Sequence, residues 1–491
     1  MKKKLSLAEY VLLMIILIFG FYKAYSLHAD NPYPVHHDEW QHLGIVMQTM
    51  EFGYISEKNP NLVKAEPFHD LERGFHIFLA DFFLLTNLEP VHGYQYLAAL
   101  FVIISGLAIF ICIYELTKNY YMSIISLLMF VLLKSNVNIL GIDYFIPLTM
   151  AIPFMFFFIL QYINSIETQN QANLATSVIL LLFLFFMHPP SMVILLIPSL
   201  IQFLNCKSVF KKKLISSKLF IIIGIIAVLA ILSLFWTESF QVTREVILDM
   251  IVFEQGWGKL EVTYFLPLLY GILPTLLAVY GFLNLSSSAS SLKLGFFSSF
   301  AVLAVALTGF FNVFGFSILV PYSRLVYYSM LAMIPLTAIG LQHVTDRVEF
   351  VKNRSHQKII LTIILIISIS LSTYELDMRY KKYSQTILTD ADYDALIWFS
   401  SNIGKDKIVL TPFFTTSAVY PVSHNFVISL VAAVLEGGHA QENLEFFQYD
   451  CEQMKNVTDS SGAEFIISRS KLECSYFSEI YSNADFIYKV I

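Results

Sequence analysis

Long apolar runs recur along this chain of 491 residues, and they constrain its fold more than any other feature. About eleven of them reach the roughly 17 to 25 residues that a helix needs to cross a bilayer. Hydrophobic residues make up 56% of the chain and charged residues only 14%. Because this composition is too apolar for an ordinary soluble protein, it predicts a polytopic α-helical membrane protein.

The positions of the basic residues predict the orientation of the chain. It begins Met1-Lys2-Lys3-Lys4, and a second basic cluster lies at residues 207–218. Because basic loops stay on the cytoplasmic side, both clusters are expected to be cytoplasmic. The first span, at about residues 10–27, lacks a small-residue cleavage site, so we expect an uncleaved anchor. Residues 28–89 are then external, in a protein of the cell (plasma) membrane.

The remaining spans follow from the same rule. Residues 74–88 are apolar but contain His76 and Asp81, which predicts an interfacial helix along the membrane and not a crossing. The next spans are expected near residues 94–116 and 121–133, and a fourth begins at residue 143. Two spans form a hairpin whose corner is at residues 187–190, and another lies at 219–236. Two more flank the linker 284–292, one lies at 322–341, and the last ends near residue 374.

Beyond residue 374 the composition becomes that of a soluble module. Residues 390–402 have helical spacing, and residues 407–410, 464–468 and 486–491 have the pattern of strands. We therefore expect a transmembrane domain at 1–374 and a small external α/β domain at 375–491. Cys451 and Cys474 lie in the external domain, where they are either bonded or two free thiols.

The first external loop contains the pentapeptide His36-His37-Asp38-Glu39-Trp40. The apolar residues of 38–50 have helical spacing, so Asp38 and His42 are expected to face the same side of a helix. One interpretation is a general base, Asp38, whose proton affinity Glu39 or His42 adjusts. The alternative is structural: Asp38 caps the helix and the histidines are solvated.

Three further polar residues are expected at the outer ends of spans. Asp143 opens the fourth span, where a carboxylate is costly unless it is paired, used or capping a helix. His188 is either a turn residue or a ligand contact. Arg324 either reaches lipid headgroups or binds a phosphate, for which a guanidinium is well shaped. The net charge of -6 and the clustering of basic residues argue against a nucleic-acid partner.

These features together resemble the GT-C superfamily of polyprenyl-phosphate-dependent glycosyltransferases, with distant similarity to oligosaccharyltransferase catalytic subunits and protein O-mannosyltransferases. The resemblance lies in the acidic pair of the first loop, the interfacial helix, Asp143, Arg324 and the external α/β domain. It implies that Asp38 of the Asp38-Glu39 pair is the catalytic base. It also implies that Asp143 occupies the place of a second acidic motif, and Arg324 that of a phosphate-binding arginine.

The chain departs from that family in three places. It lacks the WWDYG motif of the protein N-oligosaccharyltransferases, and residues 312–321 contain no acidic residue. The sequence therefore leaves open whether a divalent metal binds, with Asp38 and Asp143 as its ligands. The first loop lacks a His-Pro-Pro pattern. The acceptor is accordingly left open among a glycan, a lipid and a protein.

The sequence thus predicts an inverting glycosyltransferase of the cell envelope, which moves a sugar from a lipid-linked polyprenyl-phosphate donor to an acceptor on the outer face. Asp38 and Glu39 are its expected catalytic residues. The expected substrate-binding residues are His37, His42, His76, Asp143, His188 and Arg324. Two rival classes are weighed against it. A transporter would show charged or broken helices at mid-bilayer, and a non-catalytic membrane assembly protein would not need the acidic cluster.

Overall fold

The computed structural model describes residues 5–56, 58–63, 71–135, 139–205, 252–253, 265–285, 291–347, 354–380, 387–430 and 440–491. The basic cluster at 207–218 and the predicted span at 219–236 lie outside the described residues. The chain forms two compact units. We call the first the helical unit: Met1–Ala24, Ala98–Asp143 and Pro147–Lys382. We call the second the mixed unit: Tyr25–Leu97, Tyr144–Ile146 and Tyr383–Ile491.

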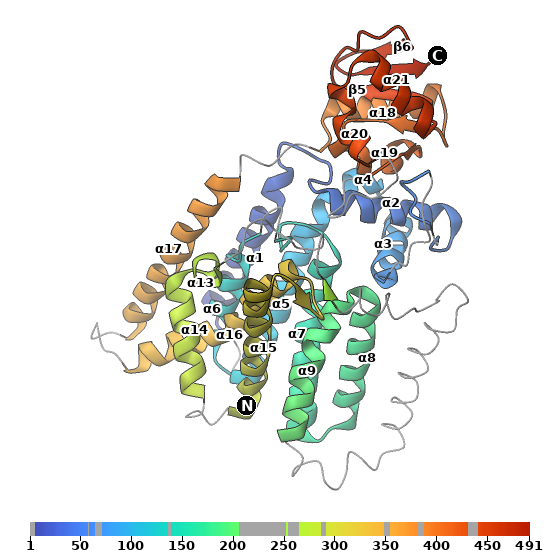
Figure 1. The fold of residues 1–491 in the computed structure, drawn as a ribbon. Coiled ribbons are helices and arrows are strands. Elements are labelled where there is room, and N and C mark those ends of the chain that lie inside the picture. The colour runs from blue at the N-terminus through green and yellow to red at the C-terminus, as the bar shows by residue number, and fades with distance from the viewer. Residues whose placement is uncertain are drawn as a thin grey trace. The chain divides into compact units, whose positions relative to one another are not determined.

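Helices of 5 to 27 residues build the helical unit (Figure 1). They are α1 (Leu7–Tyr25), α5 (Leu97–Thr117), α6 (Tyr120–Val131), α7 (Pro147–Thr168), α8 (Gln171–Met187), α9 (Pro189–Asn205), α13 (Leu266–Tyr270), α14 (Ile272–Asn284), α15 (Ser291–Phe314), α16 (Tyr322–Arg347) and α17 (Arg354–Tyr380). A short antiparallel pair, β1 (Val252–Phe253) and β2 (Ser317–Ile318), accompanies them.

Within the described residues, five helical segments are long and apolar enough to cross a membrane: Leu7–His28, Pro90–Thr117, Pro147–Thr168, Gly295–Phe314 and Tyr322–Arg347. Five shorter apolar helices have 10–17 residues: Tyr120–Val131, Gln171–Met187, Pro189–Phe203, Ile272–Asn284 and Ser355–Leu371. The predicted count of about eleven spans is therefore not confirmed. The hairpin about residues 187–190 is confirmed, since α8 ends at Met187 and α9 begins at Pro189.

Helix α16 forms the core of the helical unit. Its most apolar stretch is 94% buried, and it packs against α6, α14 and α15 (Figure 1). The crossing with α14 depends on two glycines. A Cβ atom at Gly281 would lie 2.0 Å from the carbonyl oxygen of Leu336, and one at Gly340 would lie 1.9 Å from that of Leu277. The two backbones therefore touch, as in close packing of membrane helices through small residues.

The mixed unit contains a five-stranded sheet in the order β4-β3-β5-β7-β6. Its strands are β3 (Ile408–Leu410), β4 (Phe426–Val427), β5 (Phe465–Ser468), β6 (Phe477–Ser482) and β7 (Phe486–Val490). Strand β3 is parallel to β4 and β5, whereas β7 is antiparallel to β5 and β6. Helices α18 (Asp390–Asn402), α19 (Thr416–Ser423), α20 (Ala440–Glu445) and α21 (Cys451–Ser461) accompany the sheet. The predicted helix at 390–402 and the three predicted strands are confirmed.

The first loop belongs to the same compact unit as this sheet. The amide of Val427, in the edge strand β4, donates to the carbonyl of Asn61 at 2.9 Å, and the amide of Val63 donates back to Val427 at 3.2 Å. A β-bridge from Leu62 thus covers an edge that would otherwise be open. Residues 28–89 therefore group with the tail, and the predicted boundary at residue 374 stays a prediction.

Two helices of the first loop carry the predicted interfacial segment and the acidic cluster. Helix α3 (Arg73–Thr86) matches the segment predicted at 74–88 and packs against α2 (His37–Phe52). Phe75, Leu79 and Phe83 form its buried face, whereas Leu85 is 87% exposed. A helix that is apolar on its exposed side as well is suited to a membrane surface.

Cys451 and Cys474 form a disulfide, with their Cα atoms 5.3 Å apart. Of the two outcomes that the sequence left open, the bonded one is therefore found. Cys451 is the first residue of α21, and Cys474 precedes β6, so the bond ties this helix to the approach of an edge strand.

Candidate functional site

The acidic cluster of the first loop forms the amino-terminal turn of α2. His36 is the N-cap residue, because its Nδ1 accepts the amide of Asp38 at 3.1 Å. Glu39 completes a capping box by accepting the amide of His36 at 3.1 Å. Asp38, the second residue of the helix, is therefore not its N-cap. Histidine is not among the residues usually preferred at N-caps, so the sequence did not reveal this role.

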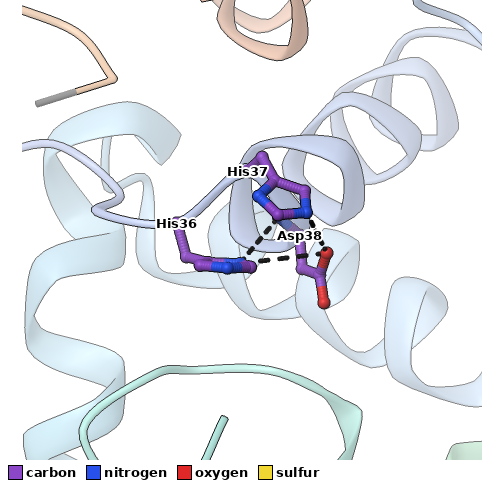
Figure 2. A group of neighbouring side chains, drawn as sticks. All are labelled: His36, His37 and Asp38. Atoms are coloured by element: carbon purple, nitrogen blue, oxygen red, sulfur yellow. Dashed lines mark hydrogen bonds and ion pairs between the residues drawn. The ribbon is translucent and has the colours of Figure 1, made fainter. Parts of the chain in front are cut away.

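Asp38 faces two imidazole rings (Figure 2). His37 Nε2 lies 3.1 Å from Asp38 Oδ1, and His36 Nδ1 lies 3.8 Å from the same oxygen. The Asp38 side chain is 29% exposed and that of His37 is 25% exposed. Asp38 thus combines partial access with one imidazole at hydrogen-bonding distance, which suits a group that accepts a proton from a ligand.

His36, His37 and Asp38 can also hold a metal ion. One ligand atom from each lies within 4.8 Å of those from the other two. Two imidazole nitrogens and a carboxylate oxygen are donors that suit zinc and similar divalent ions. Of the two metal ligands expected from the sequence, Asp38 belongs to this group, whereas Asp143 has a different environment, described below.

Glu39 differs from its neighbour Asp38 because it is fully buried. Its Oε2 accepts the amides of Val35 and His36, and its Oε1 accepts the amide of Phe145 at 2.7 Å. Burial raises the pKa of Glu39 to about 8, although the three amides act to lower it.

His42 follows Asp38 by one turn of α2. Its Nδ1 lies 2.9 Å from Nε2 of His76 on α3, and its Nε2 lies 3.9 Å from a carboxylate oxygen of Glu72. His76 is buried, with 1% of its surface exposed. The two predicted histidines therefore form a linked pair that joins α2 to α3 beside a carboxylate.

In the helical unit, Asp143 is paired with a residue that the sequence analysis did not single out. Lys23 Nζ lies 3.2 Å from Oδ1 and 3.4 Å from Oδ2 of Asp143, and it also donates to the carbonyl of Leu133 at 3.1 Å. Because α7 begins at Pro147, Asp143 is not its N-cap. Lys23 could have been found from the sequence, since a lone charge in an apolar span usually has a partner.

His188 belongs to a buried hydrogen-bonded triangle. Its Nδ1 lies 2.8 Å from Oγ of Ser191 and 3.1 Å from the hydroxyl of Tyr328, and these two hydroxyls lie 2.7 Å apart. All three residues are almost fully buried. His188 is thus a turn residue whose ring is satisfied by hydrogen bonds, and it connects the corner between α8 and α9 to α16.

The first turns of α16 also carry Arg324, which is 9% exposed. Tyr327 and Tyr328 follow it by three and four positions, so they share its side of the helix. A Cβ atom at Gly141 would lie only 2.6 Å from the Tyr327 ring, so the loop that leads to Asp143 packs against this tyrosine. The surroundings of Asp143 and His188 therefore both reach the Arg324 end of α16.

The predicted site residues thus divide between the two units. His37, Asp38, Glu39, His42 and His76 lie in the mixed unit, and Asp143, His188 and Arg324 lie in the helical unit.

The fold is similar to that of solved membrane glycosyltransferases, although no protein-family model and no curated protein matches the chain. The Archaeoglobus fulgidus oligosaccharyltransferase in complex with zinc and sulfate is 14% identical, with a TM-score of 0.59 over 93% of this chain and 68% of that one. AglB from the same organism was solved with an inhibitory peptide and a dolichol-phosphate. It is 13% identical, with a TM-score of 0.55 over 94% of this chain and 69% of that one.

A third solved structure is the arabinofuranosyltransferase AftD from Mycobacteria, which is 11% identical with a TM-score of 0.51. All of this chain is covered but only 40% of AftD. At these identities the likeness concerns the fold. The chain therefore has a fold like that of these glycosyltransferases and, with its apolar helices, is an integral membrane protein.

Proposed function

We propose that the protein is an inverting glycosyltransferase that moves a sugar from a polyprenyl-phosphate donor to an acceptor hydroxyl on the outer face of the membrane. The observation that carries this proposal is the partly exposed carboxylate of Asp38, held at the start of α2 beside His37. The GT-C-like fold supports it, since the similar structures belong to an oligosaccharyltransferase and an arabinofuranosyltransferase. AglB in particular was solved with a dolichol-phosphate.

In the proposed reaction, Asp38 accepts the proton of the acceptor hydroxyl as its oxygen attacks the anomeric carbon. A new carbon–oxygen bond forms on one face of the sugar while the bond to the donor phosphate oxygen breaks on the other, which inverts the anomeric configuration. The lipid phosphate leaves with the bonding electrons. The proton stays on Asp38 until it passes to solvent. His37, at 3.1 Å, orients the carboxylate.

Arg324 is the proposed phosphate contact. A guanidinium donates two parallel hydrogen bonds to phosphate oxygens and stabilises the negative charge that develops there. His42, His76, Asp143 and His188 are proposed to contact sugar or phosphate. That Asp38, Asp143, His188 and Arg324 line one cavity remains a prediction.

A divalent ion is compatible with this proposal. The similar Archaeoglobus oligosaccharyltransferase was crystallised with zinc, and His36, His37 and Asp38 provide suitable donors. When bound, the ion would supply positive charge beside the reacting groups. No proposed step depends on it.

The proposed location is the cell membrane, with the amino terminus cytoplasmic and the Asp38 loop and tail external. The Cys451–Cys474 disulfide supports an external tail, because disulfides persist in oxidising compartments. The donor, membrane lipids and a glycan, lipid or protein acceptor are the proposed partners.

The test follows radiolabelled sugar from polyprenyl-phosphate donors to acceptors in membranes that contain the protein. The proposal predicts transfer by the wild type, with an inverted anomeric centre in the product. Arg324→Ala should raise the KM for the donor, and Arg324→Lys should restore only part of the loss because the planar fork is gone. Absence of transfer across a broad panel of donors and acceptors would favour a transporter or an assembly protein.

A further inference from the structure

Glu39 follows Asp38 in the sequence, but its surroundings differ from those of a group that meets a substrate. We infer that Glu39 is a positioning residue, whose buried carboxylate clamps the segment Tyr144–Ile146 to the first turn of α2 and thereby sets the direction of Asp38. The inference rests on the proposed function in one respect, namely that Asp38 is the catalytic base.

The clamp consists of three hydrogen bonds to one carboxylate. Glu39 Oε2 accepts the amides of Val35 at 3.0 Å and His36 at 3.1 Å, and Oε1 accepts the amide of Phe145 at 2.7 Å. All three donors are backbone N–H groups. The two carboxyl oxygens together offer about four lone-pair sites, which are enough to accept all three donors. Glu39 thus joins segments that are 106 positions apart in sequence.

The segment that Glu39 holds has no regular structure of its own. Phe145 is fully buried, and the hydrogen bond from its amide to Glu39 Oε1 satisfies a donor that is removed from water. The hydroxyl of Tyr94 donates to the backbone carbonyl of Phe145. The Phe145 ring packs against the rings of Phe75 and Tyr94, with centroids 5.6 and 5.7 Å apart. The Phe145 peptide group is therefore fixed from both sides.

The direction of Asp38 follows from that of Glu39. Consecutive residues of an α-helix point about 100° apart. Because Glu39 points into the protein, Asp38 is turned toward the side where its carboxylate is 29% exposed. A second contact strengthens the arrangement, since the His36 ring meets the Tyr144 ring edge-on at 5.5 Å. Both oxygens of Glu39 are occupied and the residue is 0% exposed, which leaves proton transfer with a ligand to Asp38.

Hydrogen exchange of the purified full-length protein in detergent tests the clamp without any assay of activity. Glu39→Gln replaces an acceptor with an N–H group that faces a backbone donor. Exchange at the amides of residues 35, 36 and 145 should become about tenfold faster or more. The control is Glu452→Gln, in the first turn of α21, where the side chain is exposed and exchange should not change. Unchanged exchange in Glu39→Gln would overturn the clamp.

Tyr94→Phe keeps the test decisive if Glu39→Gln does not fold. It removes only the donor to the Phe145 carbonyl, so exchange should accelerate in residues 144–146 and remain unchanged at residues 35 and 36. Equal exchange in this variant and the wild type would show that the segment is not held by these contacts.

Sugar transfer separates positioning from proton transfer. If Glu39 positions Asp38, Glu39→Gln should lower kcat about tenfold or more, leave the KM for the donor unchanged and keep the acidic limb of the pH–rate profile. Loss of that limb with unchanged exchange would make Glu39 the proton acceptor and overturn the inference. If the wild type transfers no sugar, the proposed function fails, whereas the exchange experiment still decides whether Glu39 is a clamp.

Discussion

The ammonium group of Lys23 contacts both carboxylate oxygens of Asp143, with its Nζ 3.2 Å from Oδ1 and 3.4 Å from Oδ2. The two side chains are 24% and 12% exposed, so the pair is largely removed from water. Breaking such a pair leaves one charge without compensation, whereas removing both charges together does not.

Lys23→Met should therefore lower the free energy of unfolding by about 3 kcal/mol, because the largely buried carboxylate of Asp143 loses the ammonium group beside it. The double variant Lys23→Met, Asp143→Asn should recover part of that loss. Thermal unfolding in detergent measures both. A double variant that is destabilised by the sum of the two single variants would mean that the pair does not interact.

Asp485, in the turn between β6 and β7, gives the mixed unit a specific pH dependence. It is 4% exposed, and burial together with the neighbouring Asp392 raises its pKa to about 7. Burial acts to raise the pKa of Asp392 as well, but the guanidinium of Arg469, at 2.8 and 2.9 Å, holds it below its usual value. The folded state thus binds a proton at Asp485 more tightly than the unfolded state does.

The stability that this proton contributes is complete below a pH of about 4 and is lost as the pH rises through about 7. Asp485→Asn cannot titrate at this position. The melting temperature of the variant minus that of the wild type should therefore increase from pH 5 to pH 8. Asp459→Asn, an exposed carboxylate of α21, is the control and should follow the wild type. A constant difference between Asp485→Asn and the wild type across this range would contradict the assignment.

The Cys451–Cys474 bond closes a loop with a sequence separation of 23. Its loss in a Cys451→Ser, Cys474→Ser variant should destabilise the tail by about 3 kcal/mol, mainly because the unfolded chain regains freedom. Reductant should lower the melting temperature of the wild type by as much as the double substitution does. It should not change the melting temperature of the variant. Alkylation of both thiols in the unreduced native protein would show that the bond does not form.

The orientation of the chain can be tested with single cysteines. A cysteine that replaces Lys58 should react with an impermeant maleimide in intact cells, and one that replaces Lys211 should react only after lysis, because basic loops stay in the cytoplasm. Mass spectrometry or a gel shift reads out the labelling. Reaction at position 211 in intact cells would reverse the predicted topology.

The elements that the sequence predicted well are those with strong local signals. The helix at 390–402 has a capping box, in which Thr389 accepts the amide of Asp392, and regular apolar spacing. Strand β4 consists of two residues, Phe426 and Val427, which is too short for any alternating pattern. Its place in the sheet depends on partners far along the chain.

The candidate site was predictable in its residue types more than in its contacts. The spacing of Asp38 and His42 on one helix follows from local periodicity. By contrast, the burial of Glu39 depends on Phe145, and the pairing of Asp143 depends on Lys23, 120 positions away. Sequence alone carries no distance between such segments, so it groups Glu39 with Asp38, and its signal for the partner of Asp143 is limited to the lone charge of Lys23 in the first apolar span.

Sugar transfer by Asp38→Asn tests the central proposal most directly. Asp30→Asn is the matched control, since Asp30 is an exposed carboxylate in the same loop. With equal amounts of folded protein in membranes, the proposal predicts that Asp38→Asn slows transfer from the polyprenyl-phosphate donor by about 10²- to 10⁴-fold. Asp30→Asn should retain the wild-type rate. Equal rates for Asp38→Asn and the wild type would contradict the assignment of Asp38 as the catalytic base.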